Sequence, residues 1–369
     1  MDTPAQPVPV SLYDLTRDQL ASQLAEWGEP AFRVKQIRAW MYQRFADGVD
    51  DMSDLGKPLR AKLKEHFALG RLRPIADRQS SDGWTRKWLL RLSDDSDIET
   101  VLMEYDGERR TACISSQAGC AMNCSFCATG QMGFLRNLRS GEIVEQVVFV
   151  ARMLAAAAGS EAKTEPHLTN IVLMGMGEPF ANYANVMEEI ARLIEPKDSG
   201  GFGIGARKIT VSTVGVVPGI RRFAEEAMQV NLAVSLHAAT DELRSRLVPL
   251  NDKYPLRDVS RAVREYINAT NRRVSLEWAL IDGVNDMPEQ ARALVDFIRL
   301  TFDPRSEGRN MIHVNLIPLN PTSGYQGNPS NRDSARTFSE VLTAVGIPNT
   351  VRARRGIDIS AGCGQLKSE

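Results

Sequence analysis

Short apolar runs alternate with longer segments of helical periodicity from about residue 111 to residue 320. The runs predict β-strands, and apolar residues that recur every three or four positions predict amphipathic helices. The expected strands are 112–116, 170–174, 208–214, 231–236, 273–281 and 312–317. The expected helices are 141–158, 181–194, 218–226, 241–247, 256–269 and 287–300, and a polar loop then precedes one more helix at 335–345. This α/β alternation favours a parallel sheet closed partway into a barrel, with the active site at the carboxyl ends of its strands.

A different pattern precedes this region. Residues 11–69 show helical periodicity, and Thr16 and Gln19 fit a capping box at the start of the first helix. Residues 84–92 and 97–104 are strand-like and are separated by a polar turn, which predicts a β-hairpin. The expected parts are an N-terminal helical accessory domain at 1–75, a β-hairpin linker at 76–105, a (β/α)6 core at 106–350 and a C-terminal loop at 351–369.

Composition is that of an ordinary globular protein, with 43% apolar residues, 25% charged residues and a formal net charge of −1. The polar N-terminus lacks the features of a signal peptide, and no apolar run is long enough to span a bilayer. We therefore expect a cytoplasmic protein with no membrane partner. Residues 30–73 depart from the even charge balance, with ten Lys or Arg against five acids. That excess fits either solvated helix faces or contact with nucleic-acid phosphates.

The cysteines carry the clearest chemical signal. Five cysteines in a chain expected to be cytoplasmic argue for metal binding or catalysis rather than a disulfide framework. Cys120, Cys124 and Cys127 form a C-x3-C-x2-C motif with Phe126 before the last cysteine. Three thiolates on one short loop suit a 4Fe–4S cluster with one iron left open for S-adenosylmethionine (SAM). Structural zinc is the alternative, but it needs four ligands, and neither a second cysteine pair nor a nearby histidine is present.

The cysteine motif resembles the C-x3-C-x-aromatic-C signature of radical SAM enzymes, whose fold is a partial β/α barrel. The resemblance implies that Gly177 and Glu178, at the end of the second expected strand, meet the amino group of SAM. A Rossmann-type glycine pattern is not completed there, because Phe180 stands where the third glycine is needed. Residues at the ends of other expected strands complete the implied SAM site, namely Ser212, Ser235, Leu236, His237 and Asn320.

The two remaining cysteines lie apart from this motif. Cys113 belongs to the first expected strand, and Cys363 lies between two glycines near the end of the chain. A lone cysteine is most often a small apolar residue, but flanking glycines let the sulfur of Cys363 approach another group closely. Three upstream arginines, Arg352, Arg354 and Arg355, could lower the pKa of a thiol or hold a phosphate.

Six segments in the same order resemble the RlmN family of RNA adenine methyltransferases, and they are 113–120, 126–138, 175–179, 235–237, 315–320 and 358–366. The resemblance implies that one SAM methylates Cys363. A second SAM at the cluster yields a 5′-deoxyadenosyl radical that takes a hydrogen from this S-methyl group, and the carbon radical then adds to carbon 2 of adenine. Cys113 resolves the protein–RNA adduct by forming a disulfide with Cys363, and Glu99 matches the position of a proton acceptor.

The family also implies the substrates and partners. These are 23S rRNA, at an adenine of the peptidyl-transferase centre, and tRNA, at the adenine 3′ to the anticodon. We further expect an electron donor such as flavodoxin or ferredoxin, and a monomer. One alternative is a Cfr-type enzyme, which methylates carbon 8 with the same cysteine set. Another is a non-catalytic iron–sulfur or zinc protein that binds RNA, which leaves Cys113 and Cys363 unexplained.

Overall fold

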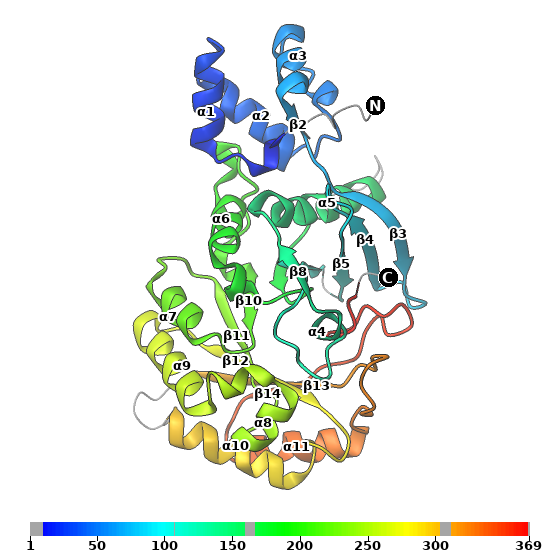
Figure 1. The fold of residues 1–369 in the computed structure, drawn as a ribbon, viewed down its shortest axis with the longest axis vertical. Helices are drawn as coiled ribbons and strands as arrows, with labels where there is room; N and C mark the ends of the chain where they lie inside the picture. Colours follow the sequence, from blue (N-terminus) through cyan, green and yellow to red (C-terminus); the bar gives the residue numbers. More distant parts are fainter. Residues whose placement is uncertain (1–9, 107, 159–166, 303–310, 368–369) are drawn as a thin grey trace, which may run out of the picture.

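A sheet of ten strands organises the computed structural model, which describes residues 10–106, 108–158, 167–302 and 311–367. The strands lie in the order β14-β13-β12-β11-β10-β9-β6-β5-β4-β3 (Figure 1). They are β3 Arg73–Gln79, β4 Thr85–Arg91, β5 Asp97–Glu104, β6 Arg110–Cys113, β9 Asn170–Leu173, β10 Ile209–Thr213, β11 Asn231–Ser235, β12 Val274–Leu280, β13 Ile312–Pro318 and β14 Asn349–Val351. Neighbouring strands from β6 to β14 pair in parallel. Strands β3, β4 and β5 extend the sheet in antiparallel pairing.

Helices follow the parallel strands in the expected order. They are α5 Ser140–Ala158, α6 Tyr183–Ile194, α7 Val217–Glu225, α8 Asp241–Leu247, α9 Leu256–Thr270, α10 Pro288–Thr301 and α11 Arg332–Ala344. The predicted partial β/α barrel is therefore confirmed. Its core lies between sheet and helices, where Trp278 of β12 and Phe338 of α11 are fully buried with ring centroids 5.5 Å apart. Within the described residues, no helix has the length and apolar character needed to cross a membrane.

The N-terminal unit contains α1 Arg17–Glu26, α2 Phe32–Tyr42 and α3 Lys57–His66. Strand β1 Val10–Ser11 precedes these helices, β2 Phe67–Ala68 follows them, and the two strands pair with each other in parallel. The predicted capping box is present, because Thr16 and Gln19 exchange side-chain and backbone hydrogen bonds. The unit lies beside α5 and α6 (Figure 1). Polar contacts attach it there, including an ion pair between Arg38 and Glu195 and a bond from Arg192 to the Tyr13 carbonyl.

Three parts of the structure depart from the prediction. Strand β3 begins inside the segment expected to be helical, and residues 76–105, expected as a linker, continue the main sheet. The side chains of β3 are mostly exposed, so its sequence lacks apolar alternation, and pairing with β4 stabilises it. Strands β7 Gln117–Gly119 and β8 Phe134–Asn137 form a small antiparallel sheet on either side of the cysteine motif. They are too short for a periodic pattern.

Candidate active site

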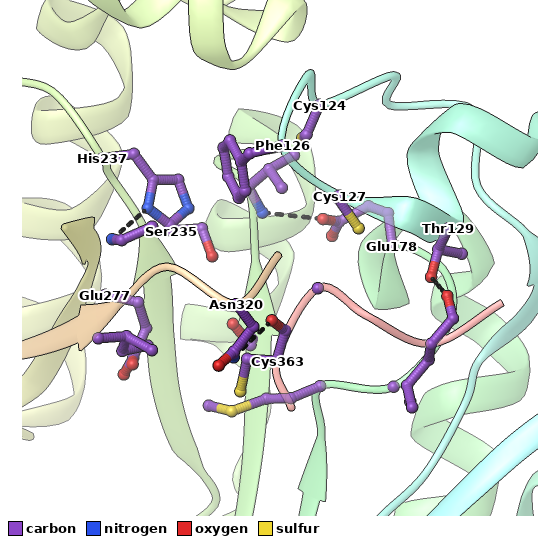
Figure 2. A pocket seen from close by; sticks show the side chains of 18 of the residues that line it. Cys124, Phe126, Cys127, Thr129, Glu178, Ser235, His237, Glu277, Asn320 and Cys363 are labelled. Carbon is purple, nitrogen blue, oxygen red and sulfur yellow. Dashed lines mark hydrogen bonds between the residues drawn. The ribbon is translucent and has the colours of Figure 1, made fainter. Parts of the chain in front are cut away.

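A cavity opens at the carboxyl ends of the parallel strands (Figure 2). Side chains associated with successive strands line it, namely Glu178 after β9, Ser212 in β10, Ser235 in β11, Glu277 in β12 and Asn320 after β13. The opposite wall comes from the cysteine loop and the C-terminal segment, through Cys124, Cys127 and Cys363. The folded chain thus brings together residues that are far apart in sequence, at the edge of the sheet where the parallel topology places ligand sites.

Cys120, Cys124 and Cys127 lie between β7 and the short helix α4, Ala128–Met132. Burial, and after it the proximity of the Cys127 thiol, raise the pKa of Cys120 to about 12 and that of Cys124 well above its ordinary value. Such neighbouring thiols become thiolates readily only when a cation replaces their protons. Among the described residues, no three His, Cys, Asp or Glu side chains converge as a single metal ion requires. Closed zinc takes four ligands, whereas a 4Fe–4S cluster with one open iron takes three thiolates, each on its own iron, so the three-cysteine loop fits a cluster.

Gly177 and Glu178 form the turn after β9. Gly177 has a φ of 101°, and a Cβ there would lie 2.6 Å from the Cβ of Gln117, so glycine is needed. The two carboxylate oxygens of Glu178 accept N–H groups from Phe180 at 3.0 Å and Val214 at 2.8 Å. Burial raises the pKa of Glu178 to about 7, and these N–H groups oppose the shift. The carboxylate thus ties β9 to the end of β10, and its remaining lone pairs can accept from a cationic ligand.

His237 has a left-handed backbone, with φ of 61°, which turns its ring into the cavity. Its Nδ1 accepts the Ala279 N–H at 3.0 Å, and burial lowers the pKa of His237 to about 3. The ring is therefore neutral, with its proton on Nε2. Leu236, by contrast, has a side chain buried in the core, so of the residues expected to bind SAM it is the one that does not line this cavity.

Two buried oxygen atoms on the cavity lining accept no hydrogen bond among the described residues. They are Oδ1 of Asn320 and Oε2 of Glu277. Arg352 lies 3.9 Å from the latter, beyond hydrogen-bond distance. Since buried polar atoms normally have partners, these acceptors fit a ligand with amino and hydroxyl donors, as SAM has. Glu277 was not predicted from the sequence, although a single charged residue inside a mostly apolar strand was a usable signal.

Cys363 borders this cavity from the C-terminal segment. Asn320 Nδ2 donates to the Cys363 carbonyl at 3.0 Å, and Thr129 Oγ1 donates to the Leu366 carbonyl at 2.6 Å. Cys363 as a residue is exposed to solvent, but its sulfur points into the protein. Burial of the sulfur raises the pKa of the thiol, and the positive charge of Arg352 opposes this shift. The thiol is accessible to a ligand in the cavity and needs to lose a proton before it acts as a nucleophile.

The other two predicted catalytic residues face different cavities. Cys113, at the end of β6, borders a second cavity that Cys363 and Arg352 also line. Burial raises the pKa of Cys113, and the charge of Cys363 raises it further; both are free thiols. Glu99, in β5, borders a third cavity together with Lys87 and Lys367. Cys363 therefore shares one cavity with the residues expected to bind SAM and another with Cys113. Glu99 lies in neither of these cavities and contacts the C-terminal segment at Lys367.

A partial β/α barrel, with a three-cysteine loop after its first parallel strand and a ligand cavity at the strand ends, defines a radical SAM enzyme. The family model of the radical SAM superfamily matches residues 114–298. The model of the ribosomal RNA large subunit methyltransferase N-terminal domain matches residues 10–69.

Individual relatives show which family of radical SAM enzymes the chain is similar to. Dual-specificity RNA methyltransferase RlmN 1 of Myxococcus xanthus is 48% identical over 358 residues, which cover 97% of this chain and 94% of the relative. The crystal structure of a radical SAM methyltransferase from Sphaerobacter thermophilus matches with a TM-score of 0.90 and 48% identity, over 98% of this chain and 100% of that one. The chain belongs to the RlmN family, and it is a SAM-dependent RNA methyltransferase that uses a 4Fe–4S cluster.

Proposed function

We propose that the enzyme methylates carbon 2 of adenine in 23S rRNA and in tRNA, with Cys363 as the relay for the methyl group. One observation supports Cys363 as the relay residue: it borders both the cavity lined by the residues expected to bind SAM and the cavity lined by Cys113. A sulfur in this position can receive a methyl group on one side and meet a second thiol on the other.

The chemistry of the substrate explains why such a relay is needed. Carbon 2 of adenine is electron-poor, so it does not attack the methyl group of SAM directly. When bound, the cluster and SAM supply a radical that activates the methyl group carried by Cys363. Cys363 holds the methyl group and then the base as a covalent intermediate. Glu99 accepts the proton that leaves carbon 2 as the adduct radical gives up one electron, for which the bound cluster would be the acceptor. Cys113 then attacks the sulfur of Cys363, so that the S–S bond forms as the S–C bond to the product breaks, and the released carbon takes up a proton. Asn320 fixes the main chain of Cys363.

RNA binding is assigned to the basic N-terminal unit. Lys64 forms an ion pair with Asp50 at 2.8 Å, and Arg60 donates to the Asp50 carbonyl at 3.0 Å, so part of the charge is offset locally. Alanine at Lys57, Arg60 and Lys64 should weaken RNA binding and reduce its salt dependence, because fewer phosphates are neutralised. Unchanged affinity across a salt titration would remove these residues from the RNA interface. We further propose a cytoplasmic monomer that receives electrons from a flavodoxin or ferredoxin.

Nucleoside mass spectrometry tests the reaction. Anaerobically reconstituted enzyme is mixed with methyl-deuterated SAM, a reductant and an rRNA fragment of the peptidyl-transferase centre, and in parallel with tRNA. We expect labelled 2-methyladenosine that disappears in Cys363→Ala. Labelled 8-methyladenosine would move the enzyme to the Cfr type. An intact cluster without any methylated base would contradict both assignments.

A further inference from the structure

Lys87 is a buried cation that joins two parts of the molecule. Its side chain is 9% exposed, and its Nζ lies 2.7 Å from Oε1 of Glu99. The same ammonium donates to the carbonyl of Ser360 at 3.0 Å. Lys87 in β4 pairs with Val101 in β5, so Glu99, two residues along, is its diagonal neighbour on the same face of the sheet. One side chain therefore contacts both the carboxylate and the segment that precedes Cys363.

Glu99 contacts the C-terminal segment on the far side of Cys363 from Ser360. Its Oε2 accepts the backbone N–H of Lys367 at 2.8 Å. Lys87 and Glu99 thus hold the C-terminal segment at Ser360 and at Lys367, three residues before and four residues after Cys363. We call these three polar contacts the clasp.

The Ser360 contact stabilises an unusual turn. Ser360 has a φ of 53°, in the left-handed region that a residue with a side chain enters at a cost. The Lys87 ammonium fixes the carbonyl of this residue. A hydrogen bond from a charged donor is stronger than a neutral one, so loss of the ammonium should release the turn.

Two cationic side chains and one main-chain donor face Glu99 from neighbouring elements. They are Lys87 in β4, Arg78 in β3 and the main-chain N–H of Lys367. Burial raises the pKa of Glu99, while Lys87 is the strongest influence in the opposite direction. Removal of the Lys87 charge therefore leaves a buried carboxyl that holds its proton to higher pH.

We propose that Lys87 is a positioning residue that couples the charge on Glu99 to the position of Cys363. While Glu99 is ionised, the clasp holds the Cys363 segment against the sheet. When Glu99 takes up a proton it becomes a neutral acid, its ion pair with Lys87 is lost, and the clasp loosens. This inference rests on the proposed function, in which the proton comes from carbon 2 of adenine. The clasp then loosens after carbon 2 of the adenine has lost its proton, which is the stage at which Cys363 has to reach Cys113.

The test compares Lys87→Met with Lys87→Arg in reconstituted enzyme. Arg86→Met is the matched control, because Arg86 adjoins Lys87 in β4 and forms an ion pair with Asp77 outside the clasp. Amide hydrogen exchange over residues 358–367 is measured without RNA. The pH–rate profile of RNA methylation is measured separately. Glu99→Gln, which keeps the shape of the neutral acid, is added to the exchange experiment.

Lys87→Met should speed exchange over 358–367 several-fold and move the acid limb of the pH–rate profile upward by about one pH unit. Glu99→Gln should speed exchange similarly, Lys87→Arg should restore the acid limb, and Arg86→Met should match the wild type. Unchanged exchange in both Lys87→Met and Glu99→Gln would overturn the clasp. Faster exchange with an unmoved acid limb would overturn the coupling. If the wild type methylates no RNA, the proposed function fails, while the exchange data still decide whether the clasp exists.

Discussion

The two walls of the main cavity are built in different ways. On the barrel wall, Glu178, Ser235 and His237 follow or end strands that pair in parallel with neighbours on both sides. On the other wall, residues 356–367 form no helix or strand. Separate contacts hold that segment, such as the bond from Gln365 Nε2 to the Pro321 carbonyl at 2.9 Å.

This difference matches two chemical tasks. A cofactor site gains from rigid groups, because preorganised contacts need no rearrangement during the reaction. In the proposed mechanism the Cys363 thiol takes a methyl group, bonds to RNA and then meets Cys113, so it has to move between partners. A segment held by a few separable contacts can do so, because its local opening costs far less than opening the sheet. Substitutions in the barrel wall should therefore impair cofactor binding, and those in the C-terminal segment should impair turnover.

The largest separation between cofactor binding, which includes the cysteine loop, and the task of the C-terminal segment is expected from two serine substitutions. Cys124→Ser should lose the cluster and all activity, because Cys124, the proposed ligand, is buried and a hydroxyl is a poor iron ligand. Cys363→Ser should keep iron content and reductive cleavage of SAM but form no methylated RNA. Iron and sulfide assays, together with SAM cleavage, separate the two variants. Loss of the cluster in Cys363→Ser would contradict the division.

Gly177→Ala should weaken SAM binding about tenfold or more. Alanine would bring its Cβ within 2.6 Å of Gln117 at a φ of 101°, and the turn between β9 and the Glu178 carboxylate would shift. Gly346→Ala is the matched control, because Gly346 also has a positive φ, of 78°, but its Cβ would meet nothing within 4 Å. Equilibrium binding of SAM to the reconstituted enzyme checks this. Equal affinities of the two variants would show that the turn tolerates the side chain.

Thr129→Val should slow RNA methylation about three- to tenfold and leave SAM affinity unchanged. The substitution keeps the shape of Thr129 and removes the 2.6 Å bond to the Leu366 carbonyl, worth about 1 kcal/mol. Thr343→Val is the control, since it removes only exposed bonds remote from the cavity, one to the Ser339 carbonyl in α11 and one from Asn349 Nδ2. Single-turnover rates and SAM titrations measure the two effects. A weakened SAM affinity with an unchanged rate would place Thr129 functionally on the barrel wall.

The smallest effect on activity is expected at the junction with the N-terminal unit. Oε1 of Glu145, in α5, accepts the N–H groups of Arg71 at 2.7 Å and Leu72 at 2.8 Å. Burial raises the pKa of Glu145 to about 7, so the folded state binds the proton more tightly than the unfolded state. This stability is present below about pH 4.5 and is lost as pH rises through about 7.

Glu145→Gln keeps an oxygen for both bonds and removes the titration. The Tm of the variant minus that of the wild type should therefore increase by about 2–4 °C from pH 5.5 to pH 8. RNA methylation should be unchanged. Thermal unfolding at both pH values gives the comparison. A parallel pH dependence of the two proteins would show that Glu145 does not titrate in this range.

Sequence alone determined the features that depend on neighbouring residues. The spacing of Cys120, Cys124 and Cys127 places three thiols on one loop whatever the rest of the chain does. Strand and helix periods depend on local burial, so the parallel strands and the helices between them were predicted to within a few residues. The capping box at Thr16 is equally local, and the structure contains it.

Tertiary structure alone decided the contacts between distant residues. Strand β3 is a strand because β4 pairs with it, and its own polar sequence does not show this. Glu277 becomes a cavity residue only when β12 lies between β11 and β13. The sequence offers Glu99 as a proton acceptor, but only packing shows that its partners are Lys87 and the Lys367 main chain. Local patterns report which side of an element is buried, whereas the partners of a buried charge depend on how the elements pack.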